Sequence, residues 1–274
     1  MNPQSRTTRR LTIAFVVFVL LAWLMPTFWL VNVALKTQAQ LFVRTPSFIF
    51  TPTFENFGIA IFQYGILRNA LHSFVIAAAS TALTLVLAML FVYGITRFRF
   101  QFRNPLLMWI LNLRMLPPIA IVIPFYVLYS DVGLIDTYRG MVLAYLPLTL
   151  PLAVWLLYGF AQELPLSIDE AALIDGANRW QIFRDMIFPL MRPALAVAGT
   201  FCFLEVWNEF VLALILTGPN TKTVPIGLSE FITEHAVEWG PMSAAALVLL
   251  LPLLFVTYFL QGSLVRGLTL GAVR

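Results

Sequence analysis

Long apolar segments separated by short polar connections dominate this chain. The first runs from Leu11 to Leu35, 25 residues without a charged side chain. As a helix, about twenty apolar residues span the roughly 30 Å hydrocarbon core of a bilayer. This segment alone therefore predicts a helix that crosses a membrane.

Composition extends that prediction to the whole chain. Only 11% of the residues are charged and 60% are hydrophobic, whereas soluble domains carry roughly 25% charged residues. A net charge of +4 is compatible with nucleic-acid binding, but surplus Arg and Lys in a membrane chain mainly set its orientation. We therefore expect contact with membrane lipid and no nucleic-acid partner. The single cysteine, Cys202, excludes an intramolecular disulfide.

Six apolar segments follow one another, at 11–35, 71–96, 105–129, 141–160, 187–216 and 244–264. They predict an all-α integral membrane protein with six transmembrane helices. A signal peptide also begins with positive charge, but its apolar region is only 7–15 residues and a small-residue cleavage site follows. The first segment is longer and passes directly into Lys36, which indicates a retained span.

The expected organisation has five parts. They are an N-terminal segment 1–10, the first span 11–35, an outer segment 36–68, a core of five spans at 69–266 and a tail 267–274. The core includes a charged loop at 165–189 and an outer loop at 218–240.

The distribution of basic residues orients these spans. If the N-terminus is inside, the inner segments hold 11 of the 17 Arg and Lys residues and the outer segments hold 5, with Arg114 inside a span. Short cytoplasmic loops carry such an excess. The bias therefore places both termini and the charged loop in the cytoplasm.

The charged loop contains signals for two short helices. Ser167 followed by Glu170 fits a capping box, with serine as the N-cap. Gly176 stands where a glycine would end that helix, and Asn178 with Gln181 would cap a second one. We therefore expect two short helices joined at Gly176.

A spaced set of residues marks the same loop: Glu170, Ala171, Ala172, Asp175, Gly176 and Pro189. A solvated helix-turn-helix explains the charges alone, with the two alanines leaving a low surface that another protein can approach. The combined spacing, however, resembles the cytoplasmic coupling loop of the permease subunit of ATP-binding-cassette (ABC) importers. The family's Ile-x-Leu-Pro appears here as residues 186–189, Met-Ile-Phe-Pro, which keeps the apolar character but departs in identity.

The resemblance extends over nearly the whole chain. Residues 207–210 (Trp-Asn-Glu-Phe), 223–228 (Thr-Val-Pro-Ile-Gly-Leu) and 267–273 are similar to the smaller, second permease subunit of maltose-type importers in the carbohydrate-uptake branch. The resemblance implies a type I ABC importer permease fold in a bacterial inner membrane.

The resemblance also implies roles for particular residues. The residues expected to couple to an ATPase subunit are Glu170, Ala171, Ala172, Asp175, Gly176, Arg179, Trp180, Phe183 and Pro189. The tail residues expected to touch the same subunit are Gly271, Ala272 and Val273. The outer loop 218–240 would contact a sugar-binding protein.

The implied assembly contains a homologous second permease subunit, two ATPase subunits and an extracytoplasmic sugar-binding protein. ATP and Mg would be bound by the ATPases, because this chain has no Gly-x-x-x-x-Gly-Lys-Ser/Thr loop. We expect no cofactor and no catalytic residue in the chain itself. The pattern leaves open which sugar, polyol or sugar derivative is carried.

Charged and polar side chains occur within the expected spans: Arg114, Glu205, Asn208 and Glu209. At 1.5 Å per residue, Arg114 and Glu205 lie about 16 and 20 Å from the nearest inner arginines. A mid-membrane arginine costs several kcal/mol unless it is paired or faces water. We expect an Arg114–Glu205 ion pair or a shared water-lined cavity, with Asn208 beside it and Glu209 on the same helix face. A translocation pathway and a purely structural pair are equally compatible with this pattern.

Two other classes of membrane protein fit the sequence less well. An ion-coupled secondary transporter favours repeated halves with paired broken helices, and residues 1–137 and 138–274 show no convincing self-similarity. A membrane enzyme is disfavoured because no His-Glu-x-x-His or Gly-x-Ser-x-Gly motif is present. His72 and His235 have no companions at metal-ligand spacing.

Overall fold

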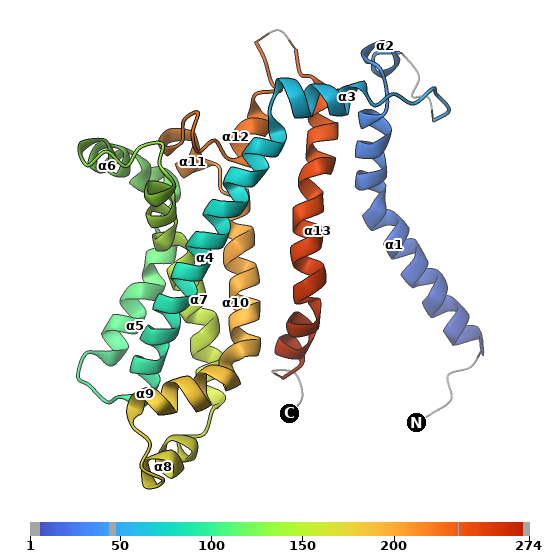
Figure 1. Ribbon diagram of the computed structural model, residues 1–274. Coiled ribbons are helices and arrows are strands. Elements are labelled where there is room, and N and C mark those ends of the chain that lie inside the picture. The colour runs from blue at the N-terminus through green and yellow to red at the C-terminus, as the bar shows by residue number, and fades with distance from the viewer. Residues whose placement is uncertain (1–5, 44–47, 235, 271–274) are drawn as a thin grey trace. The chain divides into compact units, whose positions relative to one another are not determined.

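The computed structural model describes residues 6–43, 48–234 and 236–270, and these residues are almost entirely helical (Figure 1). Within these ranges the only β-type pairing is an isolated bridge between Ile232 and Val237. The prediction of an all-α membrane protein is confirmed. The described residues divide into two compact units, one within 6–66 and 228–251, the other within 67–227 and 252–270.

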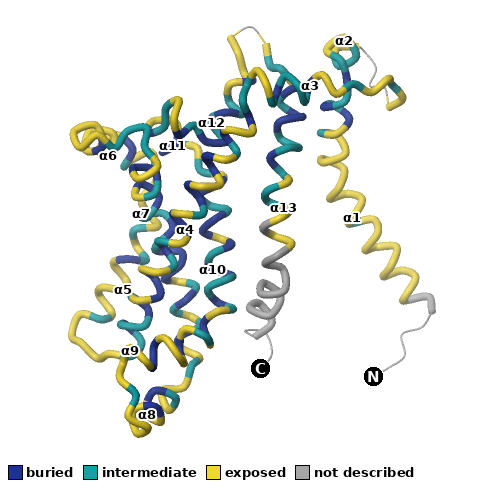
Figure 2. Tube along the Cα trace, in the orientation of Figure 1, coloured by how far each residue is buried: buried dark blue, intermediate teal, exposed yellow. Residues whose placement is uncertain are grey.

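The first unit is built from elements at both ends of the chain. They are α1 (Arg6–Ala34), α2 (Gln38–Leu41), α3 (Glu55–Gly58), the π-helical turn η1 (Ile59–Gln63) and the first half of α13 (Trp239–Leu270). The most apolar part of α1 buries none of its residues inside the protein, and Figure 2 colours most of the described part of this helix as exposed. Exposed apolar side chains along a helix of this length suit the hydrocarbon core of a membrane.

The second unit holds the rest of α13 and the remaining elements. They are α4 (Ile66–Arg97), α5 (Arg103–Asn112), η2 (Leu113–Met115), α6 (Pro118–Asp131), α7 (Tyr138–Glu163), α8 (Ser167–Ile174), α9 (Arg179–Gln181), the π-helical η3 (Ile182–Ile187), α10 (Phe188–Asn208), α11 (Val211–Leu216) and α12 (Val224–Ser229). The most extensive helix contact in this unit is between α7 and α10, which lie side by side in Figure 1.

Small and polar side chains let the helices of the second unit approach closely. The hydroxyls of Thr84 on α4 and Thr149 on α7 lie 2.6 Å apart and share a hydrogen bond. Cys202 Sγ on α10 donates to the carbonyl oxygen of Thr149 at 3.6 Å. In a membrane, such contacts and close packing hold helices together, because lipid tails remove most of the hydrophobic drive.

Four helices of the described chain are long and apolar enough to cross a membrane: Arg9–Ala34, Ile66–Arg97, Tyr138–Glu163 and Arg179–Asn208. A fifth is reached if the bent pair of α5–η2 and α6 counts as one span. The shorter stretch Trp239–Phe255 is also apolar. The structure therefore supports several spans, and the count of six stays a prediction.

The third expected span, 105–129, is not one straight helix. Its two halves, Arg103–Met115 and Pro118–Asp131, are bent by 97°. Pro117 is extended (φ −68°, ψ 134°) and Pro118 is the first residue of α6. A proline inside a helix removes a backbone donor and clashes with the preceding turn, whereas proline at the first helical position is favourable. The adjacent prolines therefore end one helix and begin the next.

The expectation of an unbroken fifth span at 187–216 is wrong as well. The helix α10 ends at Asn208, Glu209 is extended (φ −72°, ψ 127°), and α11 begins at Val211. Glu205 and Glu209 consequently do not share a helix face.

Candidate functional site

The charged loop, residues 165–189, forms a compact foot at one end of the second unit (Figure 1). Its first helix, α8, begins at Ser167 with Leu166 as the N-cap and without a side-chain cap. The expected serine cap is therefore wrong. A backbone turn takes its place, in which the amides of Asp169 and Glu170 donate to Leu166 O at 3.0 and 3.1 Å.

The end of α8 follows the prediction. Gly176 has a φ of +84°, a left-handed conformation that glycine adopts without steric cost. Its amide donates to Leu173 O at 3.1 Å, and the amide of Ala177 donates to Ala172 O at 2.9 Å. These two bonds form a Schellman motif, so Gly176 stops the helix and turns the chain.

The second helix of the foot starts with the predicted capping box. Asn178 Oδ1 accepts from the Gln181 amide at 2.9 Å, and Gln181 Oε1 accepts from the Asn178 amide at 2.7 Å. The helix does not end there, since α9 and η3 run directly into α10. Pro189 occupies the beginning of α10. The second half of the foot is therefore the first part of a membrane-spanning helix.

Two residues expected on the docking surface are buried. Ala172 is 1% exposed and Phe183 is 8% exposed. The Phe183 ring packs 5.0 Å from Tyr93 on α4 and 5.3 Å from Trp180. Ala172 and Phe183 therefore attach the foot to the helices and are not available to another protein; the low surface is provided by Ala171, which is exposed.

A buried ion pair strengthens this attachment. Arg97 Nε, at the end of α4, lies 3.0 Å from Asp169 Oδ2 on α8, and the two side chains are only 4% and 5% exposed. Arg97 Nη2 also donates to Leu164 O at 3.4 Å. No sequence signal predicts this pair, because 72 positions separate the partners and no local pattern relates them.

The outward side of the foot carries most of the other predicted coupling residues. Glu170, Ala171, Asp175, Gly176, Arg179 and Trp180 are exposed, and Figure 2 shows the outer turn of α8 as exposed. Ile174, which is not among the predicted coupling residues, is 86% exposed beside them. An apolar residue on the outer turn of a well-capped helix was the available signal for it.

The intramembrane polar residues are only partly brought together. Arg114 Nη1 lies 3.7 Å from Glu205 Oε2, so the expected ion pair is present, with side chains 50% and 28% exposed. Asn208 Nδ2 donates to Leu204 O of its own helix at 2.7 Å. Glu209 instead caps α11, accepting from the Leu212 amide at 3.0 Å.

This capping explains the break in the fifth span. The Glu209 carboxylate accepts from the second and third residues of α11, Leu212 and Ala213, which have no intrahelical partner for their amides. A carboxylate at a helix start is stabilising. One acidic side chain therefore compensates for the interrupted backbone.

On the opposite side of the second unit, Asp136 joins two loops. Its carboxylate accepts from the Gly218 amide at 2.9 Å, the Asn220 side chain at 2.9 Å and the Thr221 hydroxyl at 2.7 Å. Burial raises the pKa of Asp136, but the hydrogen bonds from Thr221, Asn220 and Gly218 outweigh burial, so its pKa lies below the usual value. The start of the outer loop is thereby fixed to the turn before α7.

The tail residues Gly271, Ala272 and Val273 lie outside the described residues. Within the described residues, no cluster of three His, Cys, Asp or Glu side chains is arranged to hold a metal ion.

Comparison with known proteins identifies the family. Residues 85–270 match the family described as "Binding-protein-dependent transport system inner membrane component". The match covers well over half of the chain. The chain belongs to this family. The resemblance inferred from the loop spacing is thereby confirmed.

Individual relatives align over almost the full length. The chain is 32% identical to the probable ABC transporter permease protein y4oR of Sinorhizobium fredii, over 98% of both chains. It is 33% identical to the trehalose transport system permease protein SugB of Mycobacterium tuberculosis, over 92% of both. A solved bacterial ABC transporter involved in import of the polysaccharide alginate matches with a TM-score of 0.75, 20% identity and coverage of 96% and 99%. That structure shows a shared fold.

Proposed function

We propose that this family member is the permease subunit of an ATP-driven, binding-protein-dependent importer of a sugar or sugar derivative. Named relatives support the substrate class, since they include permeases for trehalose and for sulfoquinovosyl glycerol. The proposal includes six spans, both termini in the cytoplasm and location in a bacterial inner membrane. The partners would be a homologous permease subunit, two ATPase subunits and an extracytoplasmic sugar-binding protein.

The foot is the observation that carries this proposal. Its outer turn is exposed, whereas its inner side is fixed by the Arg97–Asp169 pair and by the buried Ala172 and Phe183. A foot built this way can transmit displacement, because it cannot move without the helices that hold it.

The route of transmission follows from the connections of the foot. Closure of the ATPase dimer on binding ATP would push on the exposed turn around Ala171 and Ile174. The push would reach α4 through Asp169 and α10 directly, since α9, η3 and α10 are continuous. These helices would then turn from an inward-facing to an outward-facing arrangement.

Ala171→Arg tests the docking. The substitution adds bulk and charge to an exposed position and leaves the core of the foot unchanged. We expect the purified complex to lose binding-protein-stimulated ATPase activity and to retain fewer ATPase subunits. Gln101→Arg, at an exposed site between α4 and α5 on the same side of the membrane, is the control. Stimulated activity that survives Ala171→Arg would refute the docking role.

A role in translocation is proposed for the polar residues beside the two helix breaks. Arg114 lies three residues from the break at Pro117 and Glu205 lies four residues from the break at Glu209, about one helical turn in each case. Interrupted helices at membrane depth are tolerated where they line a cavity or pack on protein, and they form substrate sites in many transporters. We expect Arg114→Ala to lower uptake while assembly stays normal; normal uptake would leave a structural role only.

No observation favours an ion-coupled secondary transporter. That mechanism would leave the exposed turn of the foot without a partner, and the family match points to binding-protein-dependent transport. The tail residues 271–273 remain proposed contacts of the ATPase subunit by resemblance alone.

A further inference from the structure

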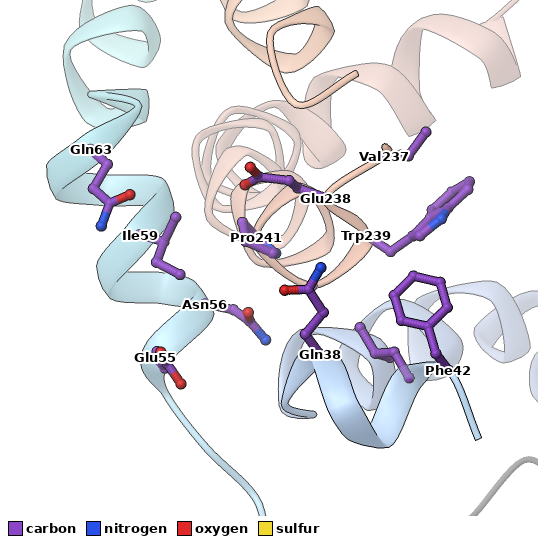
Figure 3. A pocket seen from close by; sticks show the side chains of 12 residues that line it. Gln38, Phe42, Glu55, Asn56, Ile59, Gln63, Val237, Glu238, Trp239 and Pro241 are labelled. Carbon is purple, nitrogen blue, oxygen red and sulfur yellow. The ribbon is translucent and has the colours of Figure 1, made fainter. Parts of the chain in front are cut away.

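A polar pocket of about 250 Å³ lies in the first unit (Figure 3). Its lining residues are Gln38, Leu41, Phe42, Glu55, Asn56, Ile59, Gln63, Val237, Glu238, Trp239, Gly240 and Pro241. They come from α2 and the residue after it, from α3 with η1, and from the start of α13 with the two residues before it. Neither the coupling foot nor the intramembrane ion pair contributes to this pocket.

The walls of the pocket are held by specific contacts. Asn56 Nδ2 donates to Ala34 O at 2.8 Å and to Lys36 O at 2.7 Å, which fixes α3 to the end of α1. Gly240 lies so close to Asn56 that a Cβ at this position would be 2.6 Å from Asn56 Oδ1. The pocket is therefore a fixed feature of the unit and not a gap between mobile loops.

Two carboxylates give the pocket its charge. Glu55 and Glu238 line it, and none of its twelve lining residues is basic. The Glu238 side chain points toward the helix that carries Ile59 (Figure 3). Burial and a hydrogen bond to Glu238 raise the pKa of Tyr64, so this hydroxyl stays protonated and can hold the carboxylate in place.

Aromatic rings and carboxamides complete the lining. Trp239 and Phe42 are 53% and 66% exposed, and Gln38 and Gln63 stand on two different walls. A guanidinium or ammonium group is attracted to an aromatic face and forms charge-assisted hydrogen bonds with carboxylates. Carboxamide oxygens accept its remaining N–H groups.

We propose that this pocket receives an arginine or lysine side chain of the extracytoplasmic binding protein. The inference rests on the proposed function, which supplies the orientation and the partner. The charge preference lies in the pocket itself, because Glu55 and Glu238 line it and none of its lining residues is basic. The expected outer segments as a whole, 36–68 and 218–240, carry four acidic and four basic residues. Complementary charge of this kind steers encounter and fixes the register of a complex.

Affinity of the binding protein for the assembled importer in lipid nanodiscs tests the inference. Glu238→Gln removes the pocket charge and keeps an acceptor for Tyr64. We expect it to weaken binding roughly 10- to 100-fold, the range for losing a hydrogen bond to a charged group. Glu234→Gln removes the same charge from an exposed site outside the pocket and should weaken binding less than about threefold.

The outcomes separate the two proposals. If the wild-type importer does not bind the binding protein at all, the proposed function fails. If the importer binds it and both variants weaken binding equally, only long-range charge acts and the pocket inference is wrong. If Glu238→Gln changes the affinity for free sugar without the binding protein, the pocket is a sugar subsite and the inference is also wrong. Recovery of binding when Glu238→Arg meets an Arg→Glu or Lys→Glu variant of the binding protein would identify the inserted residue.

Discussion

Replacing Asp169 with alanine would leave the guanidinium of Arg97 without its carboxylate at a site where both side chains are at most 5% exposed. Removing one partner of a buried ion pair costs about 3–5 kcal/mol, because the remaining charge stays desolvated. Two features of the site favour the lower end of that range.

The first feature is the contact itself. The two atoms lie 3.0 Å apart, but their alignment is not that of a hydrogen bond, so the attraction is mainly between charges. The second is the position of Arg97 as the last residue of α4, from which a long side chain can turn toward water. We therefore expect Asp169→Ala to loosen α8 by about 3 kcal/mol, on the order of 100-fold in its opening equilibrium.

Hydrogen–deuterium exchange of the assembled importer in nanodiscs measures this opening. Backbone amides of α8 should exchange on the order of 100-fold faster in Asp169→Ala, while amides in the middle of α7 keep the wild-type rate. The double variant Asp169→Leu with Arg97→Met should regain most of the protection, because apolar side chains of similar size often replace a buried pair without loss.

Two results would refute this reasoning. Unchanged exchange in Asp169→Ala would mean that the other contacts of the foot hold it without the ion pair. A double variant that is no better than the single one would mean that the loss came from packing and not from the uncompensated charge.

Two further predictions concern the turns of the second unit. Gly176→Ala should destabilise the foot by about 1 kcal/mol through its left-handed backbone alone, since no atom lies within 4 Å of the added Cβ; faster exchange of the Ala177 amide would show it, and an unchanged rate would contradict it. The pKa of Asp136 is lowered in the fold, so the stability that it contributes is present above its ordinary pKa of 3.8 and is lost as the pH falls through the lower folded value. Thermal unfolding of the purified protein between pH 2 and 6 should show this loss, and Asp136→Asn should flatten that part of the profile; identical profiles would exclude the contribution.

Local sequence signals predicted the geometry of the foot at the positions where only one or a few residue types can adopt the required backbone or make the required cap. Gly176 is left-handed because only glycine adopts that conformation without cost, and Asn178 with Gln181 forms a reciprocal cap that depends on neighbours three positions apart. Ser167 failed for a related reason. The backbone turn that begins at Pro165 starts the helix one residue early, and a turn of this kind competes with the side-chain cap without leaving a sequence signature.

Features that depend on tertiary structure were outside the reach of those signals. Hydropathy alone could not show that Glu209 would leave α10 to cap α11, since an unbroken apolar segment predicts an unbroken helix. Ala172 and Phe183 belong to a pattern that the resemblance associates with docking, yet the structure buries both. The Arg114–Glu205 pair could be predicted because an isolated charge in lipid is costly. Arg114 therefore needs an acidic partner at a similar depth, and Glu205 lies at such a depth.

The burial of Ala172 and Phe183 changes how the coupling pattern should be interpreted. A coupling loop has to bind a partner and also resist the force that the partner applies, and a single short helix can meet both needs only by dividing its faces between them. In α8 the inner face holds Asp169 and Ala172, whereas Ala171 and Ile174 are exposed on the outside. Substitutions at neighbouring positions should therefore separate the two functions: changes at Asp169 should loosen the foot, and changes at Ala171 should release the ATPase from an intact foot. Because no capping box ties Glu170 to Ser167, replacement of Glu170 also belongs to the second class.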